Sequence, residues 1–266
     1  MKATEIIDII EKVAAPNHAA AWDASGVQVA ALRPDVSRVA VMLDPTLENL
    51  TRAADSGADF ILAHHPLGMK PRFPNRVDGY LSILSLLFSR GIWLYSAHTP
   101  LDASPAGPVR WLADDLGLQR VATLEPSAPA DDAAIAPGFG FCGYLPQALA
   151  YGDFCRHLAA ALGRGQWQVC GPQPDMVRCV ACCPGSGSSM TEAALAHGAD
   201  LFITGDVKYH AALDAAALGL RVMDVGHFVL EEEMMRRFAA RLGQALCIPV
   251  QFYPSRDPIC AEHAEP

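Results

Sequence analysis

The stretch Ala58-Asp59-Phe60-Ile61-Leu62-Ala63-His64-His65-Pro66-Leu67-Gly68 is the segment from which the fold can be worked outward. Its apolar run, residues 60–63, has the length and composition of a buried strand, and the following proline cannot continue a strand ladder. Ligands of open α/β folds bind at the carboxyl ends of strands. Because successive strand residues point to opposite faces, His64 and His65 can bind one metal ion only if the strand ends between them. The open alternatives are one imidazole for each of two neighbouring ions, or two ordinary loop histidines.

The composition is that of an acidic chain with enough apolar residues for a substantial core. Of its 266 residues, 51% are hydrophobic, and 29 acidic against 20 basic residues give a formal charge of −9. We find no lysine and arginine cluster of the kind that holds nucleic acid, and no apolar segment approaching the length of a membrane span. The first residues lead into an amphipathic pattern and not into a signal peptide. We therefore expect a cytoplasmic protein that binds neither nucleic acid nor a membrane.

Eight cysteines are scattered over the second half of the chain. Cys179 and Cys182 form a single CxxC, but they lie in a run that is typical of a strand, which would place them on opposite faces. We therefore expect reduced and mostly buried thiols and not a thiolate metal site.

Apolar periodicity predicts alternating helices and strands. In the first half we expect helices that end at Pro16, near Gly57, at Gly91 and near Leu116. Strands are expected to end at residues 29, 43, 63 and 97. Residues 122–137 have the composition of a linker. We therefore predict two α/β domains, residues 1–125 and 126–266.

An internal repeat relates the two halves. When Gly57 is placed on Gly198, residues 56–61 match residues 197–202, and the turn 44–46 falls on 185–187. The pair His64-His65 then falls on Gly205-Asp206. We therefore predict an α/β fold of two similar halves that arose by internal duplication and face each other across a metal-containing cleft. The polar residues expected near that cleft are His64, His65, Asp102, Thr204, Asp206 and His227.

Two further motifs add potential metal ligands. His98-Thr-Pro-Leu-Asp102 follows a predicted strand, and His227-Phe-Val-Leu-Glu231 places an imidazole and a carboxylate one helical turn apart. Ligands of this kind without thiolate suit divalent zinc, iron, manganese or nickel. Five ligands, two of them carboxylates able to bridge, fit a centre of two metal ions. The alternatives are that Asp102 caps a loop and that Glu231 lies at a solvent-facing helix end.

Other polar residues at strand ends are candidates for contact with a substrate. Thr204-Gly205-Asp206-Val207-Lys208-Tyr209-His210 places Asp206 and His210 one turn apart, and we assign both to proton transfer. Gly185-Ser186-Gly187 can bind phosphate at a helix N-terminus or be a plain turn. Trp22-Asp23 shapes the cleft or anchors its loop. The residues expected to contact the substrate or to support the ligands are His98, Thr204, Lys208, Trp22, Asp23 and Ser186.

In their order and number, these motifs resemble the NIF-three-like family, often named GTP cyclohydrolase 1 type 2, in its short form without an inserted domain. The resemblance covers nearly the whole chain. It implies two α/β domains, a dinuclear metal site and a ring-shaped homohexamer. The metal ligands of the family fall on His64, His65, Asp102, His227 and Glu231. The chain departs from the family pattern at Phe141, where arginine is usual, and at Leu230, where threonine is usual.

Two functions from different classes follow. The first is a metal-dependent hydrolase whose metal ions activate water. If the resemblance extends to activity, it opens the ring of a guanine nucleotide as a GTP cyclohydrolase does; another nucleotide or a phosphoester is a related small-molecule substrate. The second is a metal-binding regulator or interaction protein without turnover.

Overall fold

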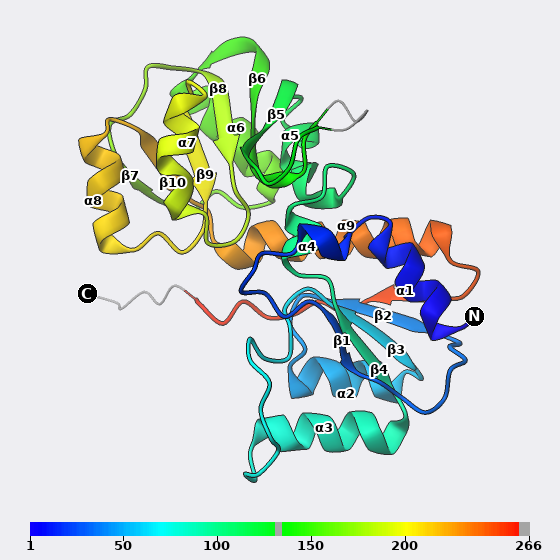
Figure 1. The fold of residues 1–266 in the computed structure, drawn as a ribbon. Helices are drawn as coiled ribbons and strands as arrows, with labels where there is room; N and C mark the ends of the chain where they lie inside the picture. Colours follow the sequence, from blue (N-terminus) through cyan, green and yellow to red (C-terminus); the bar gives the residue numbers. More distant parts are fainter. Residues whose placement is uncertain (131–134, 261–266) are drawn as a thin grey trace.

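The computed structural model describes residues 1–130 and 135–260, which form two β-sheets with helices around them (Figure 1). In the first sheet the strand order is β1 (Gly26–Val29), β4 (Trp93–Ser96), β3 (Phe60–Ala63), β2 (Val39–Met42) and β11 (Val250–Phe252). Strands β4, β3, β2 and β11 are parallel, and β1 is antiparallel to β4 at the edge. Each short apolar run predicted as a strand in the first half of the chain is therefore a strand of this sheet.

The second sheet combines three parallel strands with antiparallel strands on both sides. Its strand order is β5 (Gln119–Pro126), β6 (Gly138–Ala150), β8 (Met176–Cys182), β9 (Leu201–Thr204), β10 (Arg221–Asp224) and β7 (Gln168–Cys170). Strands β8, β9 and β10 run parallel, while β5, β6 and β7 pair antiparallel with their neighbours. Together the two sheets confirm the predicted α/β class.

The helices begin and end where the local sequence allows. Thr46 caps α2 because its Oγ1 accepts a hydrogen bond from Asn49 N at 3.2 Å, and Gly91 ends α3 in the left-handed conformation. In the described ranges no helix has both the length and the apolar composition that a bilayer span needs. The α-helices are α1 (Ala3–Glu11), α2 (Leu47–Asp55), α3 (Gly79–Arg90), α4 (Thr99–Asp102), α5 (Trp111–Asp115), α6 (Tyr151–Leu162), α7 (Thr191–Ala196), α8 (Tyr209–Ala217) and α9 (His227–Ala245). The 3₁₀ turns are η1 (Pro16–His18), η2 (Pro108–Arg110) and η3 (Ser188–Met190).

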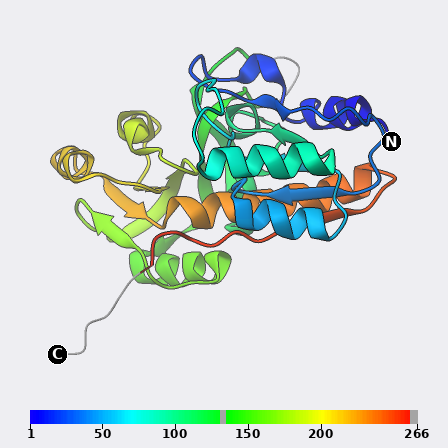
Figure 2. The same ribbon diagram turned by 90° about the horizontal axis from the view of Figure 1, so that it is seen from below.

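The first sheet is covered on both faces. Helices α2 and α3 lie side by side on one face, whereas α1 and α9 cover the other (Figures 1 and 2). Alternate strand residues therefore enter different cores: Ile61 packs with the residues of α2 and α3, while Phe60 and Leu62 pack with α1 and α9. The core around α9 also includes Ile203 and Met223 of the second sheet. Helix α9 thus joins the two halves through one continuous apolar core.

The two sheets contain the same four-strand arrangement. The order β1-β4-β3-β2 in one sheet corresponds to β7-β10-β9-β8 in the other, each with one antiparallel edge strand. The strands β3 and β9 are those that the repeat aligns. This correspondence supports the predicted internal repeat.

Sheet membership does not follow the predicted division of the chain at residues 125 and 126. That boundary falls inside β5, which pairs with β6 of the second sheet, and β11 near the C-terminus returns to the first sheet. The predicted linker 122–137 is therefore wrong over residues 122–126. Residues 131–134 of that stretch lie outside the described residues.

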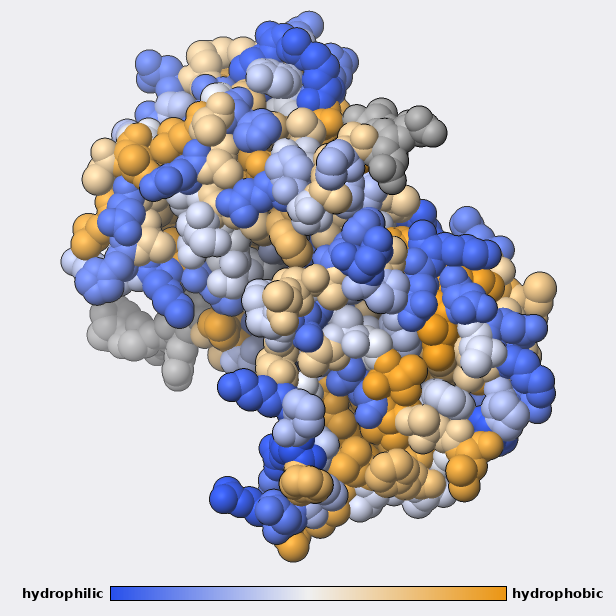
Figure 3. Space-filling model, in the orientation of Figure 1, coloured by the Kyte–Doolittle hydropathy of each residue, from blue (hydrophilic) through white to orange (hydrophobic). Residues whose placement is uncertain are grey.

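All eight cysteines are free thiols. The expectation of mostly buried thiols holds for half of them: Cys142, Cys179, Cys182 and Cys183 are buried, Cys155 and Cys170 are partly buried, and Cys247 and Cys260 are exposed. On the face seen in Figure 3, hydrophilic and hydrophobic residues alternate, and the more extended apolar area lies over the first half.

Candidate metal centre

The predicted ligands meet where strands of both halves end. Strand β3 stops at Ala63, and the amides of both His64 and His65 donate to the carbonyl of Leu43, each at 3.1 Å. Sharing one acceptor interrupts the alternation of the strand, and the two rings lie with their centroids 5.0 Å apart. Strand β3 thus ends before the pair and not between its two histidines, so joint binding of one ion by His64 and His65 stays a prediction.

Helices that follow the neighbouring strands carry the other predicted ligands. Asp102 is the last residue of α4, which follows β4, and His227 and Glu231 lie in the first turns of α9, which follows β10 (Figure 1). Glu231 is buried, so the solvent-facing helix end considered as an alternative is wrong. The carboxyl ends of β3, β4 and β10 therefore converge on one place.

Glu231 is the centre of the cluster. Its Oε2 lies 2.7 Å from Nε2 of His227, 3.2 Å from Nε2 of His65 and 3.8 Å from Nε2 of His64. Nε2 of His64 also lies 3.5 Å from Oδ1 of Asp102. The sets whose ligand atoms lie within 4.8 Å of one another are His64, Asp102 and Glu231; His65, His227 and Glu231; and His64, His65 and His98.

Each of the four imidazoles is held through its Nδ1 atom. Nδ1 lies 3.0 Å from the carbonyl oxygen of Ala97 in His64, and 2.7 Å from a carboxylate oxygen of Asp44 in His65, of Asp23 in His98 and of Asp206 in His227. Hydrogen bonds of this kind fix the ring orientation of metal-binding histidines and increase their basicity. The Nε2 atoms are therefore left for the centre of the cluster.

Two buried atoms of the cluster fit a cation. Among the described residues, Nε2 of His64 and Oδ1 of Asp102 are buried without a hydrogen-bond partner, although they face each other at 3.5 Å. Leaving such groups unsatisfied costs about 1–3 kcal/mol each. A divalent ion would satisfy both atoms, so the donor set fits a metal.

The pKa values of the clustered residues also fit a cation site. Burial works to lower the pKa of His65, but hydrogen bonds to Asp44 and Glu231 raise it to about 10. For His227, burial is likewise outweighed by Glu231 and Asp206, and the pKa rises to about 9. Burial opposes ionisation of Glu231, yet the nearby histidines hold its pKa well below its usual range. In the metal-free protein, protons on the imidazoles of His65 and His227 thus occupy the place that a metal ion takes when it binds.

The structure separates the two residues predicted to transfer protons. Asp206 has a left-handed backbone (φ 56°) and contacts His227, so it lies beside the cluster. It does not cap α8, since that helix begins at Tyr209 and has no side-chain cap. His210 is exposed on α8, and its ring lies beside that of Tyr209. Asp206 therefore remains a candidate for the site, whereas no described contact brings His210 or the exposed Lys208 to the cluster.

The glycine turn lies directly against the central carboxylate. Gly185 has φ 71°, and a Cβ at this position would lie 2.3 Å from Oε1 of Glu231. Buried Thr204 holds the turn, because its Oγ1 accepts from Gly187 N at 2.9 Å and donates to Gly185 O at 3.3 Å. Ser186 is exposed. The absence of a side chain at Gly185 thus lets the carboxylate of Glu231 lie directly against this turn. Phosphate binding at the turn stays a prediction.

Asp23 anchors the loop that precedes β1. Its side chain is fully buried and accepts hydrogen bonds from Ser25 Oγ and Thr99 N as well as contacting His98. Although burial raises the pKa of Asp23, these hydrogen bonds hold it below its usual range. Trp22 is 63% exposed, with its ring centroid 5.8 Å from that of His98.

Sequence reasoning missed Asp44. The local pattern places it only at a helix start, yet Thr46 caps α2 and Asp44 binds His65. A signal was available, because Asp44 follows β2 as His65 follows β3, and both strands end at the same edge of the sheet. Glu232, which the neighbouring charges suggest is exposed, is instead partly buried, and burial raises its pKa to about 7.

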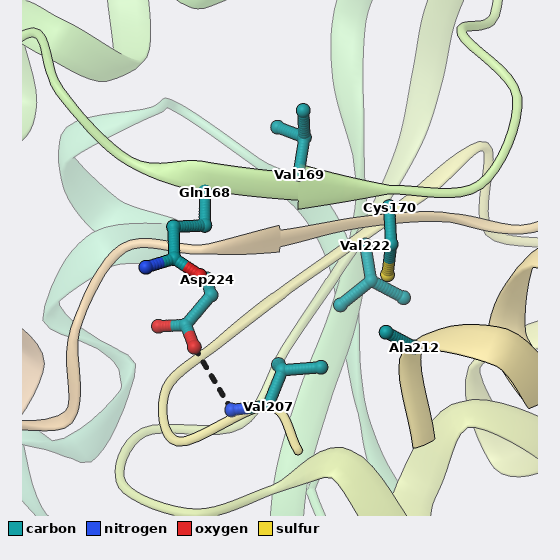
Figure 4. Close-up of a pocket in the computed structure, with 7 residues that line it drawn as sticks. All are labelled: Gln168, Val169, Cys170, Val207, Ala212, Val222 and Asp224. Atoms are coloured by element: carbon teal, nitrogen blue, oxygen red, sulfur yellow. Dashed lines mark hydrogen bonds between the residues drawn. The ribbon is translucent and has the colours of Figure 1, made fainter. Parts of the chain in front are cut away.

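A small cavity of about 50 Å³ lies elsewhere, between β7, β10 and α8 (Figure 4). The carboxylate of Asp224 reaches toward it and accepts a hydrogen bond from Val207 N at 2.8 Å. Its lining residues are Gln168, Val169, Cys170, Val207, Ala212, Val222 and Asp224. None of these is a predicted ligand.

The fold and the cluster together define a class: a two-sheet α/β protein whose strand ends carry a histidine and carboxylate site suited to metal ions. A family model described as Duf34/NIF3 (NGG1p interacting factor 3) matches residues 1–258, and the chain belongs to this family. This confirms the resemblance seen in the sequence motifs.

Individual relatives agree with this assignment. The chain is 30% identical over 259 residues to the "GTP cyclohydrolase 1 type 2 homolog" of Clostridium perfringens, covering 97% of both chains. It is also 30% identical to a protein of that name from Methanocaldococcus jannaschii, covering 94% of this chain and 98% of that one. Among solved structures, reduced HcgD from Methanocaldococcus jannaschii matches with a TM-score of 0.81 and 28% identity, over 95% of this chain and 98% of that one. A Bacillus cereus protein related to NIF3 shares the fold, with a TM-score of 0.85 at 24% identity and coverage of 98% and 99%.

Proposed function

We propose that this protein is a hydrolase that uses two divalent metal ions. The observation that carries the proposal is the position of Glu231, whose Oε2 lies within 3.8 Å of three imidazole Nε2 atoms. One ion would be held by His64 and Asp102 and the other by His65 and His227, with Glu231 shared between them. Zinc, iron, manganese and nickel all suit these ligands.

When bound, such an ion lowers the pKa of water enough to make hydroxide available near neutral pH. The residues of the chain do the remaining work. Asp44 and Asp206 orient His65 and His227 through Nδ1, and Asp206, whose side chain is 41% exposed, is placed to exchange protons with solvent. The burial of His64 and Glu231 excludes water from the inner side of the cluster.

The proposed substrate is a nucleotide, and the proposed reaction is the hydrolytic opening of a guanine ring or hydrolysis of another nucleotide bond. The names of relatives at about 30% identity support the first option, and the donor set is compatible with both. Family membership also supports a homohexamer. The acidic composition, with no basic cluster, supports a cytoplasmic protein that acts on small molecules and not on nucleic acid.

A second candidate is a metal-binding regulator or interaction protein without turnover. The family description itself refers to an interacting factor. The near-complete burial of His64 and Glu231 also fits a closed coordination sphere, which leaves no position for substrate. Turnover by the metal-loaded protein separates the two candidates.

The test compares Glu231→Gln with Glu233→Gln, a matched change on the same helix. Glu233 binds Arg236 and Arg237 and belongs to none of the three ligand sets. We expect the first variant to lose bound metal and the hydrolytic opening of the guanine ring of GTP, and the second to retain both. Metal content is measured by elemental analysis and ring opening by the change in guanine absorbance. Metal-loaded protein that hydrolyses neither GTP nor other nucleotides would favour the binding protein.

A further inference from the structure

Trp22 combines high exposure with a firmly anchored backbone. As a whole residue Trp22 is 63% exposed, whereas the side chain of the next residue, Asp23, is fully buried. Asp23 accepts hydrogen bonds from Ala24 N at 2.7 Å and from Thr99 N at 3.1 Å. On the other side of Trp22, Ala20 N donates to Thr99 Oγ1 at 3.0 Å. The loop is therefore tied to the start of α4 on both sides of an indole that most of the surrounding chain leaves uncovered.

The indole lies one ring beyond the proposed metal centre. Its centroid is 5.8 Å from that of His98, with an angle of 72° between the planes. The His98 ring is in turn 5.1 Å from that of His64 and 5.5 Å from that of His65. Trp22 thus extends the line of imidazoles outward from the buried ligands to the solvent.

We propose that Trp22 is a stacking platform for a planar heteroaromatic ring of the substrate, an inference that rests on the function proposed above. A tryptophan offers a large flat surface with few rotatable bonds, so little conformational entropy is lost when a ring packs on it. Stacking accepts any base because every base has a π-face. Trp22 would hold the ring at the rim of the cluster while the bond to be hydrolysed lies toward His64 and His65.

Other exposed aromatic residues do not share this setting. Phe73 and Phe88 are 85% and 64% exposed, and Phe88 lies on α3, the helix on the outer side of the first sheet (Figure 1). Tyr209 is 74% exposed and lies beside His210. Within the described residues, Trp22 alone among these four has a ring contact with an imidazole of the cluster. Phe88 is therefore a matched control for the loss of an exposed aromatic side chain.

The experiment measures binding of guanosine 5′-monophosphate and of ribose 5-phosphate to zinc-loaded protein by calorimetry. The variants are Trp22→Ala, Trp22→Phe and Phe88→Ala. Loss of one base–aromatic stack weakens binding by roughly 5- to 150-fold, so we expect that weakening for the nucleotide in Trp22→Ala only. Trp22→Phe keeps a π-face and should bind almost as the unchanged protein does. Binding of the sugar phosphate should be the same in all variants.

Two results would overturn the proposal: no measurable binding of the nucleotide to the unchanged zinc-loaded protein, or equal weakening of both ligands in Trp22→Ala. The proposal would also be wrong if Trp22→Ala left nucleotide binding intact and changed the oligomeric state measured by sedimentation. The indole would then belong to a contact between copies of the chain. Binding and metal content are measured without turnover. Failure of the hydrolase proposal alone would therefore be seen as a protein that binds zinc and nucleotide but releases no product.

Discussion

The two halves of the molecule share four strands in the same order but use equivalent positions differently. In the first half, β3 is followed by His64 and His65, both proposed ligands; in the second half, the aligned strand β9 is followed by Gly205 and Asp206. A Cβ at Gly205 would lie 2.3 Å from the backbone nitrogen of His227. The second half therefore has no side chain at the first of these positions, and the space lets α9 begin there and supply His227 and Glu231. A repeated scaffold can thus support one site with ligands from non-equivalent positions.

Gly205→Ala should break this arrangement and have the largest effect. The added methyl group meets backbone atoms of α9 and not a flexible side chain, so we expect a loss of about 1–3 kcal/mol in the free energy of unfolding and reduced metal content. Denaturant unfolding and elemental analysis measure the two effects. Gly152→Ala is the control, because a Cβ added there would have no atom within 4 Å and the backbone is not in the left-handed region. Equal stability of the two variants would show that β9 and α9 can separate without cost.

Asp44→Asn and Asp206→Asn compare the carboxylates that hold one imidazole in each half: Asp44 holds His65, and Asp206 holds His227. Each removes the charge that orients one imidazole, and we expect about 10- to 100-fold weaker metal binding. Asparagine tolerates the left-handed backbone at residue 206, so little strain is added. Asp55→Asn, which alters a surface pair with Arg90, is the control. The readout is zinc affinity by competition with a chelator.

A different outcome is informative for Asp206. If it carries protons and does not position His227, Asp206→Asn keeps its metal and loses turnover by about 10²–10⁴-fold. Unchanged zinc affinity and unchanged turnover would remove Asp206 from the site altogether.

The pH dependence of stability should differ between metal-free and zinc-loaded protein. Folding raises the pKa of His65 from 6.5 to about 10 and that of His227 to about 9 in the metal-free protein. A raised pKa adds stability that is complete below the unfolded value and is lost as the pH rises through the folded value. The metal-free protein should therefore become less stable from pH 6.5 to 10.

Zinc should reverse part of that trend, because it replaces the protons and binds more tightly as they leave. Denaturant unfolding with a chelator or with zinc, across this pH range, gives both curves. In His227→Gln the slope of the metal-free curve should be smaller. A metal-free curve that rises with pH would contradict the assigned hydrogen bonds.

Much of the fold was predictable because it depends on local pattern. The short apolar run bounded by a histidine pair and proline is β3, at the predicted residues. Two strands were not predictable in this way. β5 has the composition of a linker and is a strand because β6 pairs with it, and β11 is three residues long and joins a sheet that begins more than 200 residues earlier. For β11, a pairing partner more than 200 residues away in the sequence leaves no local periodicity.

The sequence by itself determined the residue types of the site and their places after strands and at a helix start, since a His-His pair, HTPLD and HxxxE can be seen locally. Only the tertiary structure decided how they are used. It brings Asp44 to His65 and Asp23 to His98, and it turns Asp206 toward His227 through a left-handed backbone. It also leaves His210 outside the cluster on an exposed face of α8. The reason is physical: a hydrogen bond requires atoms about 3 Å apart, and the approach of two separate loops to that distance depends on the packing of both sheets against α9.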